Sequence, residues 1–511
     1  MDDFLKDFRF PPTIEQQAIL AAVTGSEEPI MIDAKAGTGK TTTLKMVAGA
    51  LPRRPSLALA FNKKIKEELE AAFPDHFTVK TMNGLGAGAW NKAIGKRCQV
   101  DTDKLGKILK AFIKSNSVEL DRDDFSTVLQ LVKRARTMGL VPEGARATVI
   151  VKDNPDGWEA VADSLFLDAS ETQIWVARSV LRECIKQSYT GLVDFDDQIY
   201  MSALFGGVFD KYPLVMVDEA QDLSPLNHIQ VRKSAAGRLI VVGDPRQAIY
   251  AFRGADSSSM DSLRGLRENW IDLPLSTTFR CPKAVVARQQ THAPGYNAHA
   301  TAPDGEVVNF SSDWQAASLS PGGEQVAILC RNNAPLFAAA LRLIKQHIGC
   351  TLMGSEIGKA LITLSKKVLP DDDASVELCI GLLREWGESE ISKARANGKD
   401  ERVALIQDKW DCFEAVIENS DAKTAGDIRR TLSTMFQAGS IRFTLATGHK
   451  AKGLEWHTVV HLDPWRVPSK YAKTQAAAGH MIALQQDMNL QYVIETRTKF
   501  RLVLANLEEM Q

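Results

Sequence analysis

Short, continuous apolar runs recur along the chain, and each one ends in a polar or small residue. Runs of this length suit strands buried on both faces of a parallel sheet, because a buried helix would usually be longer. Helical patterns lie between the runs, as at residues 63–72. Strand alternating with helix predicts an α/β sheet whose ligands bind at the carboxyl ends of the strands. The runs in the first half are residues 29–33, 57–61, 214–218 and 239–244.

A second set of apolar runs predicts a second α/β core. These runs are residues 326–330, 443–447, 458–462 and 501–505. Two other segments, from about 84 to 190 and from about 356 to 437, are rich in amphipathic helical patterns and poor in strand-like runs. They predict one helical insertion in each core. The predicted division is therefore 1–83 with 191–272 for the first core, 84–190 for its insertion, 273–355 with 438–511 for the second core, and 356–437 for a short second insertion.

Composition limits the class of protein. With 511 residues, 44% hydrophobic and 24% charged, the chain is typical of a globular protein of several domains. No apolar run approaches the roughly 20 residues that span a bilayer, and the acidic N-terminus lacks a signal-peptide pattern, so we expect a cytoplasmic protein with no membrane partner. The seven cysteines are scattered without a CxxC pair, which indicates neither a disulfide framework nor a zinc or iron–sulfur site. A net charge of −1 means that any nucleic-acid contact comes from a local groove.

A glycine-rich loop follows the first apolar run and opens a helical pattern. Glycines let backbone N–H groups turn toward phosphate oxygens, and the helix N-terminus favours the anion. We expect Lys40 at the β- and γ-phosphates of ATP and the Thr41 hydroxyl on Mg²⁺. The alternative is a chance glycine-rich turn, since the first position of the general GxxxxGK[ST] pattern is not glycine here. The loop residues are Ala34, Lys35, Ala36, Gly37, Thr38, Gly39, Lys40 and Thr41.

An acidic pair ends the third run. Asp218 is suited to hold Mg²⁺ through water, and Glu219 is placed to polarise an attacking water. The alternative is that the pair only caps a helix. Together with the phosphate loop, the pair predicts nucleotide hydrolysis, which kinases, transporters and recombinases share.

Residues 243–255, Gly-Asp-Pro-Arg-Gln-Ala-Ile-Tyr-Ala-Phe-Arg-Gly-Ala, narrow the class. They resemble motif III of the UvrD/Rep/PcrA helicases of superfamily 1. The resemblance runs from about residue 10 to the end and leaves the helical insertions largely unmatched. It implies two RecA-like parallel-sheet cores. It also implies that Gln16 reads the adenine edge and that Gln247 senses the γ-phosphate. Thr42 stands where the family often has an arginine that stacks on the base, so looser base selectivity is expected.

The resemblance also implies a set of DNA contacts. Residues 60–64 resemble motif Ia, and Thr81-Met82-Asn83 stands where the family usually has Thr-x-His, which leaves the details of that contact open. Aromatic residues near Gln247 are suited to stack bases, although isolated aromatics are more often core residues. Residues 194–197 resemble the return from the first insertion. The expected DNA contacts in the first core are Phe61, Asn62, Lys63, Thr81, Asn83, Tyr250, Phe252 and Arg253.

The second core supplies the remaining groups that the resemblance implies. Residues 275–280 resemble motif IV, in which Phe279 stacks on adenine and Arg280 reaches the γ-phosphate. Residues 444–456 resemble motif V, with Thr447 and His449 on DNA and Glu455 lining the nucleotide cleft. Residues 489–497 resemble motif VI, and Arg497 matches its arginine finger. A guanidinium suits this role because it stays charged and spreads donors over the transferring phosphoryl group. The implied catalytic set is Lys40, Glu219, Gln247, Arg280 and Arg497.

These motifs imply an ATP- and Mg²⁺-dependent DNA helicase or single-stranded DNA translocase that acts at single-strand/duplex junctions, with 3′-to-5′ polarity, in replication, repair or recombination. Partners among replication or recombination proteins are expected, and a location at a nucleoid or in an infected host's cytoplasm. The alternatives are a translocase that mainly displaces bound proteins, a scaffold with a decayed ATPase, and an RNA substrate. Residues 61–81 look like the F-box-helicase side of the UvrD group, and neither an F-box-like nor a nuclease-like extension is expected.

Overall fold

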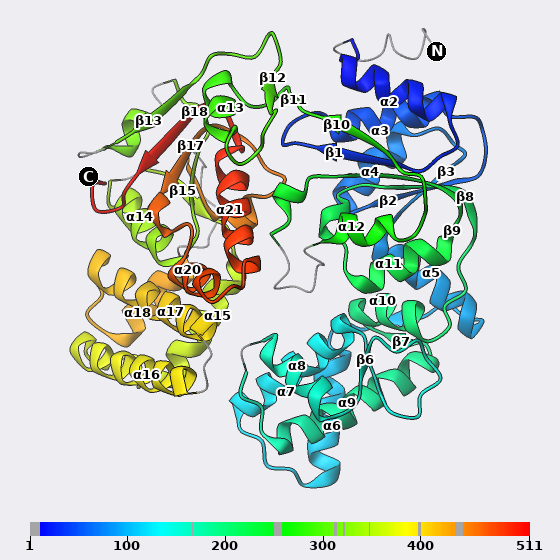
Figure 1. Cartoon of the computed structure of the whole chain (residues 1–511). Coiled ribbons are helices and arrows are strands. Elements are labelled where there is room, and N and C mark those ends of the chain that lie inside the picture. Colours follow the sequence, from blue (N-terminus) through cyan, green and yellow to red (C-terminus); the bar gives the residue numbers. More distant parts are fainter. Residues whose placement is uncertain are drawn as a thin grey trace. The chain divides into compact units, whose positions relative to one another are not determined.

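The computed structural model describes residues 11–165, 167–249, 258–310, 314–319, 322–346, 348–396, 400–434 and 443–510. The chain divides into two compact units, one of residues 1–34 and 39–276 and the other of residues 35–38 and 277–511 (Figure 1). Each unit contains a six-stranded sheet whose neighbouring strands are all parallel. Within these described residues, no helix is both long and apolar enough to cross a membrane.

The sheet of the first unit has the strand order β10-β1-β9-β8-β2-β3. Alternate residues of β1 enter different apolar clusters, because Ile30 and Ile32 pack into one cluster and Met31 into another. The sheet is therefore buried on both faces, which explains the unbroken apolar runs. Its strands are β1 Ile30–Ala34, β2 Ser56–Ala60, β3 Phe77–Thr81, β8 Tyr212–Val217, β9 Ala235–Gly243 and β10 Ile271–Leu275.

Helices follow most strands of this sheet, as the alternating pattern predicts. Several begin with side-chain caps that satisfy backbone N–H groups which the helix itself leaves unpaired. Asn62 accepts a hydrogen bond from the Ile65 amide at the start of α4, for example. The helices are α2 Ile14–Gly25, α3 Lys40–Ala50, α4 Lys63–Ala72, α5 Met82–Ile94, α10 Phe195–Leu204, α11 Pro225–Ser234 and α12 Ser259–Arg264, with the short 3-10 helices η1 Ala220–Asp222 and η2 Pro245–Gln247.

A helical segment between α5 and α10 shares with these two helices an apolar core that includes Trp90 of α5, Trp158 and Leu181, and this core is separate from the two clusters of the sheet. Its helices are α6 Lys104–Asn116, α7 Arg122–Met138, α8 Pro155–Asp163 and α9 Glu171–Tyr189, and its two-residue strands are β4 Gln99–Val100, β5 Leu140–Val141, β6 Val151–Lys152 and β7 Leu192–Val193.

A buried ionic cluster joins this helical segment to α10. Arg136 of α7 is fully buried and donates to Asp194 at 2.8 Å and to Asp197 at 2.8 Å. The Lys104 ammonium of α6 lies 2.6 Å from the other Asp197 oxygen. Buried charges are tolerated only when they are paired in this way, so the cluster fixes where the chain returns from the helical segment to α10.

The sheet of the second unit has the strand order β13-β18-β17-β14-β16-β15. Its strands are β13 Glu306–Asn309, β14 Val326–Cys330, β15 Cys350–Leu352, β16 Phe443–Thr447, β17 Trp456–Leu462 and β18 Thr498–Ala505, and β11 Thr277–Thr278 pairs separately with β12 Asn297–Ala298. The accompanying helices are α13 Lys283–Gln289, α14 Ala334–Lys345, α19 Gly448–Ala451, α20 Lys470–Ala477 and α21 Ile482–Glu495, with the short 3-10 helices η4 Ala316–Leu319 and η5 Pro464–Arg466.

Four further helices of this unit extend its main core. Cys379, Phe413 and Leu432 share one apolar cluster with Ile328 of β14. This second helical segment therefore packs onto the sheet's own core, unlike the first. Its helices are α15 Ser355–Val368, α16 Val376–Ala396, α17 Asp400–Asn419 and α18 Ala425–Thr434.

Candidate nucleotide and DNA sites

Three neighbouring strands of the first sheet place the nucleotide candidates at one edge. The loop after β1 leads to Lys40 at the start of α3, β8 leads to Asp218 and Glu219, and β9 leads to Gln247 on η2. Because β9 pairs with both β1 and β8, the three carboxyl ends are adjacent. The Lys40 Nζ lies 2.8 Å from Glu219 Oε1. The structure thus brings together four side chains from three segments that are distant in sequence.

The charged side chains at this edge shift one another's pKa values. Burial, reinforced by the neighbouring Glu219 carboxylate, raises the pKa of Asp218 to about 7, although Lys40 opposes the shift. Burial lowers the pKa of Lys40, but Glu219, Asp218 and Asp244 outweigh it and leave the Lys40 pKa raised. The Lys40 ammonium therefore stays charged, and it faces the carboxyl groups of Asp218 and Glu219. Such an arrangement suits a polyanion that arrives with a divalent cation.

Hydrogen bonds connect Glu219 to Gln247 through two residues that the sequence did not single out. Gln221 Nε2 donates to Glu219 Oε2 at 2.5 Å, and Gln221 Oε1 accepts from the Asp244 amide at 3.0 Å. Gln247 Nε2 donates to Asp244 Oδ2 at 2.7 Å. The candidate for polarising water and the candidate γ-phosphate sensor thus belong to one hydrogen-bonded chain. Gln221 lies within the motif of residues 215–222, but its role depends on the adjacency of β8 and β9.

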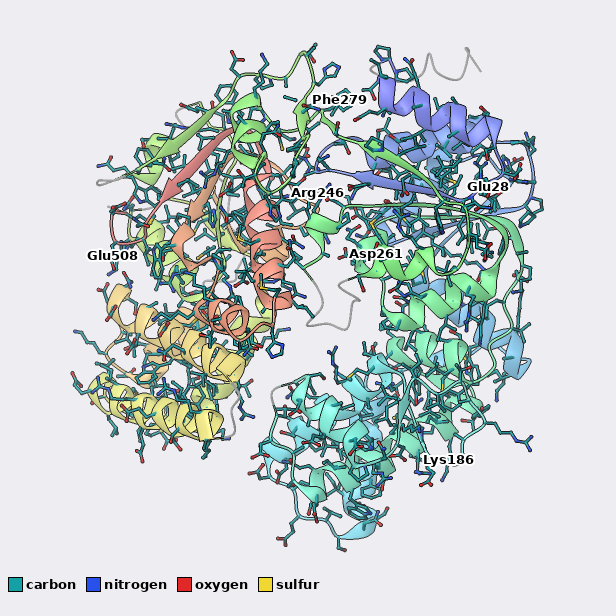
Figure 2. All side chains as sticks on the ribbon, viewed as in Figure 1. Glu28, Lys186, Arg246, Asp261, Phe279 and Glu508 are labelled. Carbon is teal, nitrogen blue, oxygen red and sulfur yellow. The ribbon has the colours of Figure 1, made fainter. Side chains whose placement is uncertain are left out.

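Arg246, labelled in Figure 2, lies on η2 beside this chain. Its guanidinium donates to both carboxylate oxygens of Asp33, on β1, at 2.9 and 2.8 Å. It also contacts Asp244 at 3.3 Å. The pair therefore ties the turn after β9 to the strand that leads into the phosphate loop.

The phosphate loop has the backbone that the glycine pattern predicts. Gly37 and Gly39 have φ values of 68° and 80°, in the left-handed region that favours glycine. The Thr38 hydroxyl donates to the Lys35 carbonyl at 2.8 Å and closes the turn. Thr42 is exposed on the first turn of α3, and Thr41 beside it is half-buried.

Gln16 is buried at the start of α2, next to α3. Its Oε1 accepts from the Thr13 amide at 3.0 Å, while the Thr13 hydroxyl accepts from the Gln16 amide at 3.1 Å, which forms a capping box. Gln16 Nε2 donates to the Thr43 hydroxyl at 3.0 Å. The candidate adenine reader is therefore also a structural link between two helices.

The DNA candidates of the first unit follow the next two strands along the same edge. Phe61, after β2, is 41% exposed, and Asn62 caps α4. Lys63 is exposed and lies 3.6 Å from Glu67. Thr81 ends β3 and accepts from the Gly84 amide at 3.1 Å. Tyr250, Phe252 and Arg253 lie outside the described residues.

The Asn83 side chain, a candidate for DNA contact, is hydrogen-bonded to two residues of α10. Its Nδ2 donates to the Phe195 carbonyl at 2.7 Å and to Gln198 Oε1 at 3.3 Å. Phe195, at the start of α10, is 57% exposed beside it. Sequence reasoning missed Phe195 as a candidate for base contact, because an apolar residue between acids reads as a core residue until its exposure is known.

In the second unit, Glu455 and Arg497 precede the paired strands β17 and β18, and Arg280 follows β11. Arg280 Nε donates to Glu455 Oε2 at 2.7 Å, and Lys499 Nζ lies 2.6 Å from Glu455 Oε1. Arg497 is 1% exposed, and its Nε donates to the Val493 carbonyl at 2.9 Å. Burial, together with the charge of Arg280, lowers the pKa of Arg497 to about 10. The structure thus brings Arg280, Glu455 and Arg497 together within this unit.

Three other candidates of the second unit remain, of which Thr447 and His449 lie apart from that cluster. The Phe279 ring stacks on His299, with centroids 4.6 Å apart and an interplanar angle of 29°. Thr447 ends β16 and His449 lies on α19, at the carboxyl edge of the sheet. His299 was not identified from the sequence, because only the pairing of β11 with β12 places it beside Phe279.

Residues 15–266 match the UvrD/REP helicase N-terminal domain. This region of the chain belongs to the UvrD/REP helicase family. The chain is 27% identical over 96% of its length to F-box DNA helicase protein 1 of Schizosaccharomyces pombe, covering 57% of that protein. It is 24% identical over 96% of its length to F-box DNA helicase 1 of Gallus gallus, covering 49% of it. It is also 23% identical over 95% of its length to ATP-dependent DNA helicase UvrD2 of Mycobacterium bovis, covering 77% of it.

The chain spans about half the length of the two F-box helicases that it matches. The matched UvrD/REP domain contains the phosphate loop, the acidic pair and Gln247, whereas Arg280, Glu455 and Arg497 lie beyond residue 266. The likeness of the second unit to this helicase family thus comes from relatives aligned over nearly the whole chain.

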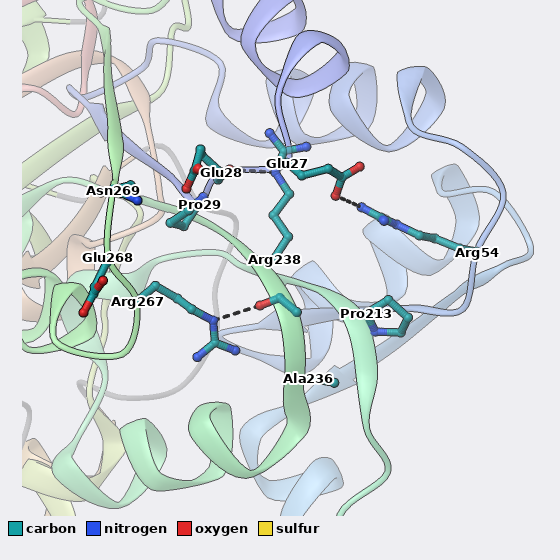
Figure 3. A pocket seen from close by; sticks show the side chains of 11 residues that line it. Glu27, Glu28, Pro29, Arg54, Pro213, Ala236, Arg238, Arg267, Glu268 and Asn269 are labelled. Carbon is teal, nitrogen blue, oxygen red and sulfur yellow. Dashed lines mark hydrogen bonds and ion pairs between the residues drawn. The ribbon is translucent and has the colours of Figure 1, made fainter.

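A cavity of about 580 Å³ lies at the opposite, amino edge of the first sheet (Figure 3). Two arginines in its wall donate to backbone carbonyls, Arg238 to Glu28 at 2.8 Å and Arg267 to Gly237 at 2.9 Å. Arg54 pairs with Glu27 at 2.9 Å. These interactions brace the strand starts and the end of α2, so the cavity is separate from the nucleotide candidates.

Proposed function

We propose that this chain is an ATP-dependent DNA helicase or single-stranded DNA translocase. The observation that carries the proposal is the edge where the Lys40 ammonium faces Glu219 and Asp218 and where hydrogen bonds run on to Gln247. These groups supply a phosphate-binding cation, a carboxylate for the attacking water and an amide at the γ-phosphate position. That combination serves phosphoryl transfer to water.

The first unit supplies the chemistry of hydrolysis. Lys40 binds the phosphates, and Glu219 orients the water and takes its proton. Asp218 and the Thr41 hydroxyl offer hard oxygen donors, which fit Mg²⁺. Bound Mg²⁺ neutralises charge that develops on the β- and γ-phosphate oxygens. When hydrolysis removes the γ-phosphate, Gln247 loses its ligand, and the chain through Asp244 and Gln221 carries that change back to Glu219.

The second unit supplies cations and a stacking surface to the same nucleotide. Arg280 and Arg497 stabilise charge on the transferring phosphoryl group, because guanidinium groups stay charged and donate along several directions. Phe279 stacks on adenine, and Glu455 orients Arg280. ATP that holds groups from both units favours a closed arrangement, and loss of the γ-phosphate releases it. Alternation between these states drives steps along DNA with 3′-to-5′ polarity.

We assign the predicted segments accordingly. Residues 1–83 with 191–272 form the first RecA-like core and 273–355 with 438–511 the second, each interrupted by a helical insertion. DNA contacts come from Phe61, Asn62, Lys63, Thr81 and Asn83 in the first core and from Thr447 and His449 in the second. We expect these residues to bind mainly the DNA backbone. Binding should therefore be sensitive to salt and largely independent of the DNA sequence.

The test is ATP hydrolysis with and without oligo(dT). We expect DNA-stimulated hydrolysis in the unmodified chain, a fall of about 10²- to 10⁴-fold in Glu219→Gln, and loss of hydrolysis in Lys40→Ala with DNA binding retained. Lys45→Ala is the matched control, because Lys45 lies on the same helix and pairs at the surface with Glu68. Turnover that persists in Lys40→Ala, or an unmodified chain without hydrolysis, contradicts the proposal.

A further inference from the structure

A tight turn after β17 presents an exposed tryptophan. Trp465 lies on η5 and is 60% exposed, although a large aromatic side chain is ordinarily mostly buried. The Arg466 guanidinium lies over the Trp465 ring, 4.5 Å from its centroid. An exposed indole with a guanidinium over one face offers a flat aromatic surface on which a nucleobase can stack.

The turn is fixed rather than loose. Asp463, buried and in the left-handed region with φ 50°, accepts from Arg466 Nε at 2.8 Å and from the Leu507 amide at 2.8 Å. The Asp463 amide in turn donates to the Ala505 carbonyl at 2.9 Å. The indole therefore stands on a backbone anchored to β18 and the segment after it. A pre-organised ring loses little freedom when it binds a partner.

The strand register places this turn on the same edge as the candidate DNA contacts. Leu329 of β14 pairs with His461 of β17, and Cys330 of β14 pairs with Thr447 of β16. The ends of β17 and β16 therefore flank the end of β14. Two strand spacings separate them, about 10 Å, which is about the length of three stacked nucleotides.

Positive charge lies close to the turn in sequence. Helix α20 begins four residues after Arg466, and Lys470 and Lys473 on it are exposed. Their ammonium groups are suited to bind the phosphates of a nucleic-acid strand that reaches the turn. Aromatic rings flanked by cations are the usual surface for single-stranded nucleic acid.

We propose that Trp465 is a stacking platform for a nucleobase of single-stranded DNA, with Arg466 covering one face of the indole. The inference rests on the proposed function, because it takes Thr447 and His449 as DNA contacts. It adds to them a base contact on the second unit. The contact tolerates any base, since each presents a flat face to the indole.

The test measures binding of fluorescein-labelled oligo(dT), and of the same oligonucleotide with abasic sites, by anisotropy without nucleotide. We expect Trp465→Ala to weaken oligo(dT) binding about 10-fold, within the roughly 5- to 150-fold that stacking of one base contributes. Trp465→Phe keeps a ring and should lose about 3-fold or less. The slope of log affinity against log salt stays unchanged, because no phosphate contact is lost.

Trp175→Ala is the matched control. Trp175 is 49% exposed on α9, and its ring lies edge-on to Phe112 with the centroids 5.4 Å apart. The Trp175→Ala variant should bind oligo(dT) as tightly as the unmodified chain does. The unmodified chain and Trp465→Ala should bind the abasic strand equally. Trp465→Ala that binds oligo(dT) as tightly as the unmodified chain overturns this inference and leaves the helicase proposal standing. An unmodified chain that binds no DNA overturns both.

Discussion

The Gln16 amide is engaged at both of its ends. Its oxygen accepts from the Thr13 amide, and its nitrogen donates to the Thr43 hydroxyl. An amide has two N–H donors and two acceptor lone pairs, so these two bonds use only part of its capacity. Reading adenine and closing the capping box are therefore compatible functions of one side chain. They can be separated by a substitution that keeps the cap and removes the donor.

Glu is the other residue that completes a capping box, so Gln16→Glu should leave α2 intact. We expect the free energy of unfolding to fall by about 1–3 kcal/mol, because the buried side chain loses the Nε2 donor that bonds to the Thr43 hydroxyl. We expect the preference for ATP over GTP to fall, because a carboxylate cannot donate to the adenine edge. Gln16→Ala removes both functions and should destabilise the chain by about 1 kcal/mol more, because the cap is lost as well.

The measurements are urea denaturation and hydrolysis rates with ATP and GTP. Thr24→Ala, on the last turn of the same helix, controls for general changes in α2, because its hydroxyl bonds only to backbone carbonyls nearby. A Gln16→Glu chain that discriminates between ATP and GTP as the unmodified chain does would remove Gln16 from base recognition.

Local sequence predicts the chemistry of a side chain but not the partners that the fold brings to it. The strand, the glycine-rich turn and the helix around Lys40 follow from the local pattern, and its phosphate role stays a prediction. The link through Gln221 and Asp244 was not predictable, because it depends on two strands becoming neighbours. Asn83 shows the same limit, since its partner Phe195 is 112 residues away along the chain.

At the scale of elements, a buried carboxylate joins the two segments that carry the arginine candidates. Glu495, fully buried at the end of α21, accepts from Arg288 Nε of α13 at 2.7 Å and from Gln491 at 3.1 Å, and lies 3.3 Å from His461. Arg280 precedes α13 and Arg497 follows α21. Glu495 therefore sets how the two guanidinium groups are placed relative to each other.

Removing this carboxylate should affect both stability and turnover. Burial raises the pKa of Glu495, but the contacts with His461 and Arg288 outweigh it and hold the pKa at about 2. Breaking a buried ion pair costs about 3–5 kcal/mol, so we expect Glu495→Gln to lose about 3 kcal/mol at pH 7. The kcat for ATP should fall more than the affinity for DNA, because the guanidinium groups lose their placement. Gln485→Glu, a change on an earlier turn of α21, serves as the control.

The pH dependence of this loss has a definite sign. The folded pKa lies below the ordinary value of 4.5, so the stabilisation by Glu495 is complete above pH 4.5 and is lost as the pH falls toward 2. In urea denaturation, the difference between the unmodified chain and Glu495→Gln should therefore shrink from pH 6 to pH 3. A difference that stays constant over that range would mean that Glu495 has an ordinary pKa.

The strands that the apolar pattern missed lie at the edges of the sheets. All eight apolar runs form interior strands, whereas β10, β3, β13 and β15 end the two strand orders. Edge strands are partly exposed, and β10 (Ile-Asp-Leu-Pro-Leu) alternates and contains Pro274. Such a pattern has no continuous apolar run, so edge strands follow from the sheet and not from local sequence.

At the scale of the whole molecule, a net charge of −1 requires the DNA contacts to be local. In the first unit, the nucleotide and DNA candidates follow neighbouring strands at one edge. In the second unit, they lie at opposite ends of β17, because Glu455 precedes this strand and Trp465 follows it. Seven residues of strand span roughly 23 Å. A rotation of this unit that follows a change at Arg280 must therefore move the DNA edge as well.

The resemblance of residues 243–255 to motif III predicts the direction of movement, which strand separation measures. We expect the unmodified chain with ATP to unwind a duplex that carries a 3′ single-stranded tail and to leave the 5′-tailed duplex intact. Arg497→Lys, which keeps the charge but not the fork of donors, should bind the tailed duplex normally and unwind it at least about 10-fold more slowly. Unwinding only from a 5′ tail contradicts the polarity. DNA-stimulated hydrolysis without unwinding, together with ATP-dependent release of streptavidin from a biotinylated 5′ end, would instead identify a translocase that mainly displaces bound proteins, since a 3′-to-5′ mover reaches that end.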